Sequence, residues 1–167
     1  MPTAPEHAIA RPDFTAFYRD AYPSVARALG ATLGDFTLGA EAADEAMARC
    51  YARWGKIQHY DNPAGWVFRV GLNWAISLKR KLRPRSGWRQ ASAVEQPPVA
   101  DPAIGEALAQ LDVDMRTVVV CRYLLDWSTN ETADALGIRP GTVKSRLHRA
   151  TRLLEGMLSH LDDRTTP

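Results

Sequence analysis

Residues 127–154, WSTNETADALGIRPGTVKSRLHRATRLL, constrain the fold more than any other part of this sequence. They predict two helices joined by a tight turn. Ser128, followed three residues later by Glu131, has the pattern of a capping box at the start of the first helix. Gly137 suits the left-handed backbone that ends such a helix, and Pro140 suits the first turn of the next one.

The second of these helices separates apolar from cationic positions. Apolar residues recur at intervals of three and four, which predicts one buried stripe: Val143, Leu147, Ala150 and Leu154. The other face and its flanks carry hydroxyl and cationic side chains, and positions 139 to 152 hold no Asp or Glu. The candidate DNA-contacting residues here are Arg139, Thr142, Lys144, Ser145, Arg146 and Arg149. Short hydroxyls allow close approach, and arginines suit phosphates and guanine edges. The pattern therefore favours a DNA-binding helix-turn-helix over a plain solvated helical hairpin.

The composition is that of an ordinary globular protein with an uneven distribution of charge. The 167 residues allow one ordinary domain or two small ones, and a hydrophobic content of 46% supports a real core. The net charge is only +2, yet residues 62–94 contain several Lys and Arg and no Asp or Glu. Two separate basic regions suit a partner that is polyanionic at two places.

Several other classes of site find no support. Cys50 and Cys121 lie in apolar helical contexts without metal-ligand spacing, so each is expected to be a buried thiol. The histidines are scattered, so no metal site and no cofactor is expected. No serine has a plausible base partner, so no enzyme active site is expected. No apolar run reaches the ~20 residues of a membrane span and no secretory signal opens the chain, which predicts a cytoplasmic protein without membrane insertion.

The N-terminal half predicts helices of its own. After a loose tail at residues 1–12, Asp13 caps a first helix that Pro23 is expected to kink or interrupt. A second helix is predicted over residues 39–54. Its early acidic residues either complement the positive end of the helix or face a partner: Glu41, Asp44 and Glu45.

A third helix is predicted from Asn62, an N-cap, to Leu82, after a short loop at residues 55–61. Its apolar stripe is Trp66, Val67, Val70, Trp74 and Leu78, and its polar face holds Arg69, Asn73 and Arg80. Aromatic residues at helical spacing are most often core, which is the expectation for Trp74. The mixture of aromatic and basic side chains suits single-stranded DNA equally well.

Residues 84–102 are rich in proline and polar residues and read as a flexible linker. The chain therefore divides into a domain over residues 13–83 and a second domain over residues 103–160. In the second domain, helices over residues 103–111 and 115–125 are expected to support the helix-turn-helix, with Asp112 or Asp114 as a cap. The fold class is all-α, with two small helical domains.

Two segments of the chain resemble bacterial RNA polymerase sigma factors of the extracytoplasmic-function (ECF, group 4) type. Residues 108–154, from LAQLDVDMRT to HRATRLL, resemble the C-terminal DNA-binding domain of that family, called region 4. Residues 62–83, NPAGWVFRVGLNWAISLKRKLR, resemble the part of region 2 that opens the promoter −10 element. The resemblance implies a factor that binds core RNA polymerase, recognises the −35 and −10 elements of promoter DNA and helps to melt the start region.

The resemblance also implies roles for individual residues. The helix-turn-helix candidates named above correspond to the helix that reads the −35 element. For the −10 element, Asn73 would hold a flipped base and Tyr60 would line its pocket, while Arg69, Lys79 and Arg80 would contact phosphates. Asp44, Arg49 and Arg53 would contact the clamp helices of the polymerase β′ subunit. An anti-sigma factor is a further partner that the resemblance suggests.

Two positions depart from the family pattern. Met47 and Ala48 replace a common Gln-Glu pair, which implies a changed or weaker set of polymerase contacts. Arg139 stands where a serine more usually caps the recognition helix. Two alternatives stay open: a stand-alone helix-turn-helix regulator that does not act through core polymerase, and a degenerate relative that occupies polymerase without initiating. The basic, aromatic third helix argues against the first of these.

Overall fold

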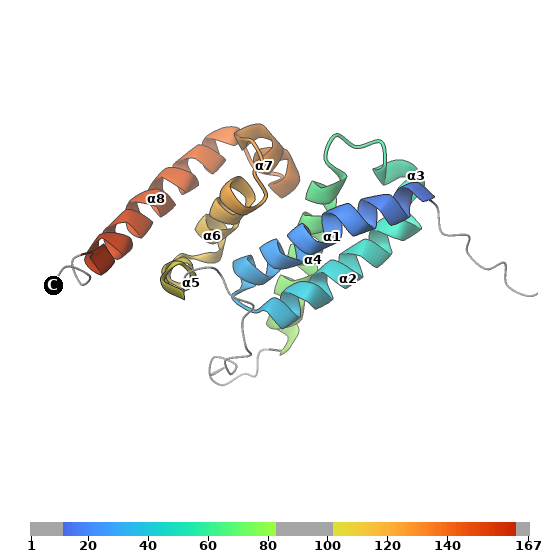
Figure 1. Ribbon diagram of the computed structural model, residues 1–167. Helices are drawn as coiled ribbons and strands as arrows, with labels where there is room; N and C mark the ends of the chain where they lie inside the picture. The colour runs from blue at the N-terminus through green and yellow to red at the C-terminus, as the bar shows by residue number, and fades with distance from the viewer. Residues whose placement is uncertain (1–11, 83–101, 163–167) are drawn as a thin grey trace, which may run out of the picture.

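The computed structural model describes residues 12–82 and 102–162, and all regular structure in those ranges is helical (Figure 1). The N-terminal group consists of α1 (Pro12–Leu33), α2 (Phe36–Ala52), α3 (Trp54–Ile57) and α4 (Pro63–Leu82). The C-terminal group consists of α5 (Pro102–Gln110), α6 (Val113–Val119), the π-helical turn η1 (Val120–Leu124), α7 (Thr129–Leu136) and α8 (Pro140–Asp162). The expected all-α class is confirmed. Residues 1–11 and 83–101, where most of the expected tail and linker fall, lie outside the described residues.

The second helix begins and ends earlier than the sequence pattern predicted. Asp35 caps α2, since its Oδ1 accepts a hydrogen bond from the Leu38 N–H at 2.9 Å, so the helix starts at Phe36 and not at residue 39. The first turn of α2 therefore holds no acidic residue. The expectation that the early acids complement the positive end of this helix is wrong. Glu45 instead pairs with Arg49 at 2.8 Å, one turn further along.

Two further expectations for the N-terminal group concern Pro23 and residues 55–61. Pro23 lies inside α1, which runs through it without a boundary. Residues 55–61 are not a simple loop, because they include most of the short helix α3, whose Trp54 and Ile57 are buried. The sequence pattern of this segment predicted a loop and did not reveal that Ile57 is buried in the core. The predicted start of α4 is confirmed, because Asn62 Oδ1 accepts from the Gly65 N–H at 2.8 Å.

The ends of the C-terminal helices follow the sequence closely. Ser128 and Glu131 form the expected capping box of α7, and Gly137 ends that helix with a left-handed φ of 67°. Asp112 caps α6 through the Met115 N–H at 2.8 Å. The single helix predicted over residues 115–125 is wrong, because its second half widens into the π-helical turn η1.

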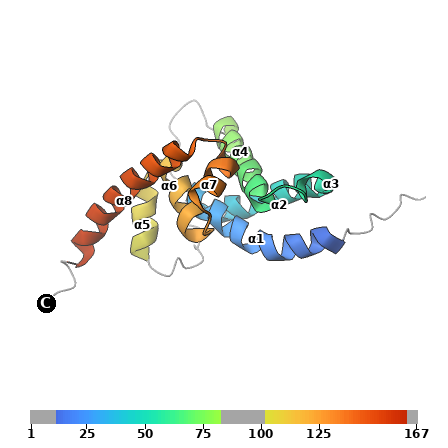
Figure 2. The same ribbon diagram turned by 90° about the horizontal axis from the view of Figure 1, so that it is seen from above.

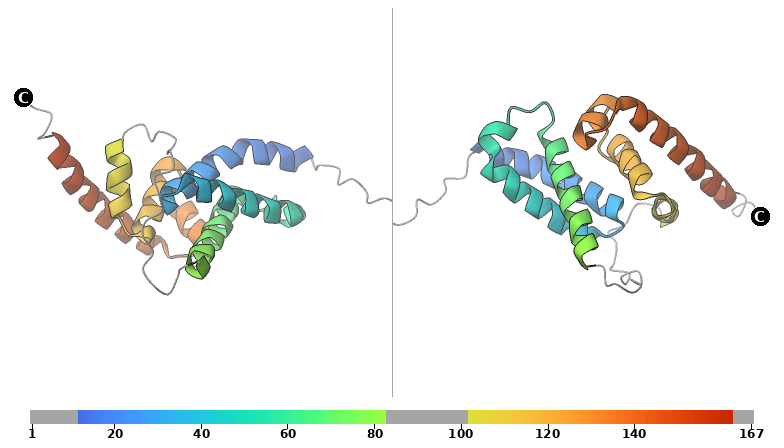
Figure 3. Two further views of the ribbon diagram at one scale, coloured as in Figure 1. Left: turned by 90° about the horizontal axis from the view of Figure 1, so that it is seen from below. Right: turned by 180° about the vertical axis from the view of Figure 1, so that it is seen from behind.

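The main hydrophobic core belongs to both groups. It holds buried side chains of α1, α2 and α4 together with Val120 and Cys121 of η1. Two smaller cores lie within the C-terminal group: Val119 and Ala150 belong to one, and Val143 to the other. Figures 2 and 3 show the result, with α7 beside α4 where the two groups meet. Cys50 and Cys121 are buried free thiols, as expected. Within the described ranges, no helix is long and apolar enough to cross a bilayer.

Candidate nucleic-acid interface

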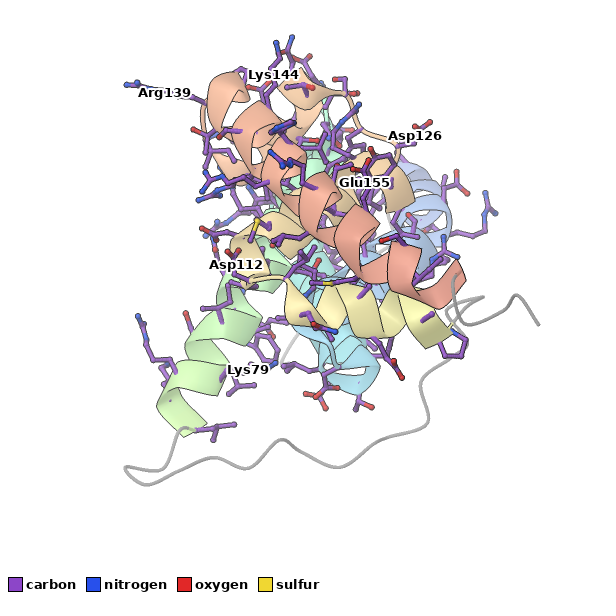
Figure 4. The ribbon with its side chains drawn as sticks, turned by 90° about the vertical axis from the view of Figure 1, so that its left-hand side faces the viewer. Lys79, Asp112, Asp126, Arg139, Lys144 and Glu155 are labelled. Carbon is purple, nitrogen blue, oxygen red and sulfur yellow. The ribbon has the colours of Figure 1, made fainter. Side chains whose placement is uncertain are left out.

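The first half of α8 presents its cationic face to solvent because its apolar stripe is fixed in the core. Val143 and Ala150 are fully buried, whereas Ser145 and Arg149 are exposed on other sides of the helix. Figure 4 shows Arg139 and Lys144 at the start of α8, with their side chains directed away from the protein. The helix thus offers a row of donors along one outward face, as a groove-reading helix requires.

Several of these donors are held in place by neighbours. Arg146 Nη2 lies 2.6 Å from the Asp114 carboxylate, and the Arg146 side chain is only 26% exposed. The Ser145 hydroxyl donates to the Thr142 carbonyl at 3.1 Å. The ion pair fixes the direction of the Arg146 side chain. A contact between Arg146 and DNA would have to break this ion pair or form beside it. Among the described residues, Arg139 and Lys144 form no ion pair.

The start of α4 forms one wall of a cleft of about 340 Å³ between the two groups. From the N-terminal group, Tyr60, Asp61, Asn62, Trp66 and Arg69 line it, and α7 contributes Glu131, Asp134 and Ala135. The structure thus brings together two of the predicted −10 residues, Tyr60 and Arg69. Asn73 is exposed one turn further along α4 and does not line this cleft.

The cations at the far end of α4 differ in their surroundings. The Lys79 ammonium donates to the Leu33 carbonyl at 3.0 Å, so it caps the C-terminal end of α1, where a positive charge is favoured (Figure 4). Arg80 is exposed. Arg80 is therefore the freer of the two for a phosphate contact, and Lys79 has a structural role that the sequence did not reveal.

The three residues expected to contact polymerase do not share one face of α2. Asp44, Arg49 and Arg53 are all exposed, but Asp44 and Arg49 are five residues apart, or about 140° around a helix. Asp44 faces Tyr22 of α1: burial raises the pKa of Tyr22 to about 12, and the hydrogen bond and charge of Asp44 add to that rise. Arg49 and Arg53 form a separate basic edge.

Sequence reasoning missed several residues at the junction of the groups. Trp66 was assigned to the apolar stripe, yet it lines the cleft. Its position one turn before Arg69 on the same helix could have indicated that the two residues share this surface. The Nδ2 of Asn62 is buried without a hydrogen-bond partner among the described residues. Glu131 and Asp134 face the same cleft from α7. No local pattern places them there, because their position depends on how the groups pack. In the described ranges no cluster of His, Cys, Asp or Glu has the form of a metal site.

Comparison with known proteins identifies the family of this chain. The family described as sigma-70, region 4 matches residues 102–154. The ECF RNA polymerase sigma factor SigL of Mycobacterium tuberculosis is 34% identical over 139 residues, covering 77% of this chain and 78% of that protein. The chain belongs to the ECF RNA polymerase sigma factors. The RNA polymerase sigma-E factor of Streptomyces coelicolor is also 34% identical, over 68% of each chain.

One solved structure has a fold similar to that of this sigma factor. The sigma factor RpoE of Bartonella quintana, in complex with the anti-sigma factor NepR, matches with a TM-score of 0.78 and 19% identity. The match covers 89% of this chain and 98% of that one, so the fold is shared over nearly its whole length. Proteins of this family are transcription initiation factors that act with RNA polymerase on promoter DNA. This sigma factor is therefore not an enzyme, and the stand-alone regulator finds no support.

Proposed function

We propose that this sigma factor reads the −35 element with α8 and takes the −10 strand on the surface of α4. Residues 13–83 and 103–160 would be the two DNA-binding domains, joined by residues 84–102. One observation carries the proposal: α8 is free of acidic residues for about four helical turns, from Pro140 to Leu154, while its apolar face packs into two cores. That rigid, cationic face suits a major groove.

On α8, phosphate and base contacts divide between different residues. Arg139 and Lys144 project from the start of the helix and would bind backbone phosphates. Thr142, Ser145, Arg146 and Arg149 would face base edges. Loss of one good bidentate contact to a base weakens discrimination by about 1–3 kcal/mol. Arg149→Ala should therefore reduce initiation at promoters with a −35 element more than Arg152→Ala, one turn further along.

On the N-terminal group, Asn73 would hold a flipped base and Tyr60 would stack beside it, with Arg69, Lys79 and Arg80 along the strand. Extrusion of a base costs a few kcal/mol, which stacking and edge hydrogen bonds offset. The exposed row of α4 that carries Asn73 and Arg80 supports this assignment.

Core polymerase would bind the exposed surface of α2. Arg49 and Arg53 form one basic edge, whereas Asp44 would contribute from a different side, beside Tyr22. We infer that the β′ clamp helices are the contact on polymerase and that the protein works in the cytoplasm, where polymerase meets promoter DNA. An anti-sigma factor is proposed as a further partner, because the related RpoE of Bartonella quintana binds one.

Reconstituted transcription with core RNA polymerase tests the proposal on a pool of candidate promoters. The wild type should direct specific starts. Asn73→Ala should still bind core and duplex DNA but open the −10 region poorly, as read by permanganate reactivity of unpaired thymines. Leu82→Ala, exposed about 180° around α4 from Asn73, is the control and should leave opening unchanged. A protein that neither joins core nor directs any start would contradict the proposal.

A further inference from the structure

Arg146 differs from the other candidate DNA-contacting cations of α8 because its side chain is already held by an acidic neighbour. It lies three residues after Val143 at the edge of the buried stripe, and its side chain is only 26% exposed. Its Nη2 lies 2.6 Å from Oδ2 of Asp114 in α6, which is 32 positions earlier in the chain. Arg149, by contrast, is exposed, and its Nε reaches only the Ser145 carbonyl of its own helix, at 3.4 Å. The two arginines are therefore prepared for DNA in different ways.

The segment that carries Asp114 is anchored on both sides. Asp112 caps α6, since its Oδ1 accepts a hydrogen bond from the Met115 N–H at 2.8 Å. The Met115 side chain packs against the small core that includes Ala150 of α8. Arg116 donates to three carbonyls in and just after α5, at 2.8–2.9 Å. Asp114 therefore projects toward α8 from a corner whose backbone is fixed by its neighbours.

A guanidinium that is already fixed can read a base at a smaller cost than a free one. An arginine side chain has many rotamers, and ordering it for a base contact costs conformational entropy. The ion pair with Asp114 restricts those rotamers before DNA arrives. A guanidinium has more N–H donors than one carboxylate oxygen uses, and Arg146 makes no other side-chain hydrogen bond among the described residues. A forked pair of donors therefore remains for O6 and N7 of a guanine, the base edge that arginine contacts most often.

The same carboxylate weakens the attraction between Arg146 and phosphates. Nonspecific binding to DNA depends on the number of cations that replace counterions along the backbone, and Asp114 neutralises one of these cations. The Asp114 side chain is itself 61% exposed, so it repels a DNA backbone that comes close to it. A guanine edge is uncharged and still gains its hydrogen bonds from Arg146. The ion pair therefore favours a base contact over a phosphate contact.

We propose that Asp114 is a specificity-determining residue of this sigma factor, which holds Arg146 for a guanine of the −35 element and lowers its contribution to nonspecific binding. This rests on the proposed role of α8 in reading that element. Asp114 touches no base itself, so it is a positioning residue that acts through Arg146. Its loss weakens discrimination and strengthens nonspecific binding, whereas a carboxylate that only stabilised the fold would not separate the two.

Initiation by the holoenzyme on a set of −35 variants tests the proposal. The full-length chain is combined with core RNA polymerase on a promoter at which the wild type starts transcription, and each base pair of the −35 element is replaced in turn. Discrimination at a base pair is the ratio of the initiation rates on the original and the replaced promoter, at limiting holoenzyme. Arg146→Ala identifies the base pair that Arg146 reads, because discrimination there should fall by about 5- to 150-fold.

Asp114→Asn removes the charge of the pair and keeps nearly the same shape. Discrimination at that same base pair should fall by at least about fivefold. Binding of the full-length chain to a duplex without a promoter should become tighter, and its log–log dependence on salt should steepen by about one. Asp112→Asn is the matched control, because asparagine caps a helix as well as aspartate and the same helix end loses the same charge. This control should keep the discrimination of the wild type.

The double variant separates an effect through Arg146 from an effect on the fold. In the Arg146→Ala background, Asp114→Asn should leave discrimination unchanged, because the arginine on which it acts is absent. An equal loss in that background would overturn the proposal, since Asp114 would then act through the structure of α6.

The remaining outcomes distinguish this proposal from the proposed function. Unchanged discrimination or unchanged nonspecific binding in Asp114→Asn would overturn the role of Asp114 and leave the proposed function intact. The same follows if Arg146→Ala alters discrimination at no base pair. A wild type that initiates equally well on every −35 variant would refute the reading of this element by α8, and the role of Asp114 with it.

Discussion

Gly137 shows, at the scale of one residue, how backbone geometry fixes the turn between α7 and α8. Its φ of 67° lies in the left-handed region, which a side chain disfavours by about 1–2 kcal/mol. The Ile138 N–H then reaches back to the Ala133 carbonyl at 3.0 Å, which closes the helix end. The turn between α7 and α8 therefore relies on a residue that adopts the left-handed conformation without strain.

Gly137→Ala should lower the free energy of unfolding by about 1–2 kcal/mol, because a Cβ strains the left-handed backbone. Chemical denaturation followed by circular dichroism measures the change. Gly156→Ala is the matched control: this glycine lies inside α8 with open space around it, so alanine there should stabilise by about 0.5–1 kcal/mol. Equal effects of the two substitutions would contradict the role of the turn.

Glu131 makes the capping of α7 sensitive to acid. Its carboxylate accepts the Ser128 N–H at 2.7 Å, and this hydrogen bond, with that of the Ser128 side chain, lowers the pKa of Glu131 below its usual 4.5. A lowered pKa in the folded state gives stability that is present above pH 4.5 and is lost as pH falls through the folded pKa. When the pH is lowered from about 5 to about 3, the melting temperature of Glu131→Gln should therefore fall less than that of the wild type. Identical pH profiles would exclude a role for this carboxylate.

At the scale of elements, the N-terminal helices cross so closely that glycines are needed at the contact points. A Cβ on Gly39 of α2 would lie 2.3 Å from the Gly30 nitrogen of α1. A Cβ on Gly71 of α4 would lie 2.9 Å from the Ala42 carbonyl oxygen. Backbone meets backbone at these points, so no side-chain movement can make room.

Gly39→Ala should destabilise the protein by about 1–3 kcal/mol or more, since α1 and α2 must move apart. Thermal unfolding of the full chain measures this. Gly105→Ala in α5 should be neutral or stabilising, because nothing lies within 4 Å of a Cβ there. A Gly39→Ala protein as stable as the wild type would mean that the crossing relaxes freely.

The same scale shows what the sequence could predict. Asn62, Ser128 and Gly137 act on their own helix ends within a few residues, so local patterns predicted them correctly. The start of α2 was misplaced because Asp35, a good cap, was read as part of a loop. The π-helical turn at residues 120–124 was not predicted, since it depends on packing against α1 and α4, far away in the sequence. The acidic wall of the cleft was missed for the same reason.

At the scale of the whole molecule, Cys121 reports whether the two groups are together. It lies fully buried at their contact, and burial raises the pKa of its thiol to about 12. Both effects slow its reaction with alkylating reagents at pH 8, because only the exposed thiolate reacts.

We expect Cys121 of the wild type to label slowly and Trp127→Ala to label faster, as read by peptide mass spectrometry. Cys50 provides an internal control. It is buried within the N-terminal helices, with a pKa raised to about 11, and should stay slow in both proteins. Parallel acceleration at both cysteines would indicate general unfolding in place of separation.

Arg116 gives the junction one further property. Its guanidinium donates to the carbonyls of Leu108, Ala109 and Leu111, all within its own group, and to Thr32 across the junction. Separation therefore breaks one of these bonds, worth about 1.5–3 kcal/mol for a charged donor, and water can take its place. The other three keep α5 and α6 assembled throughout. Arg116 thus holds the corner between α5 and α6 with three hydrogen bonds from the same side chain that links this corner to α1.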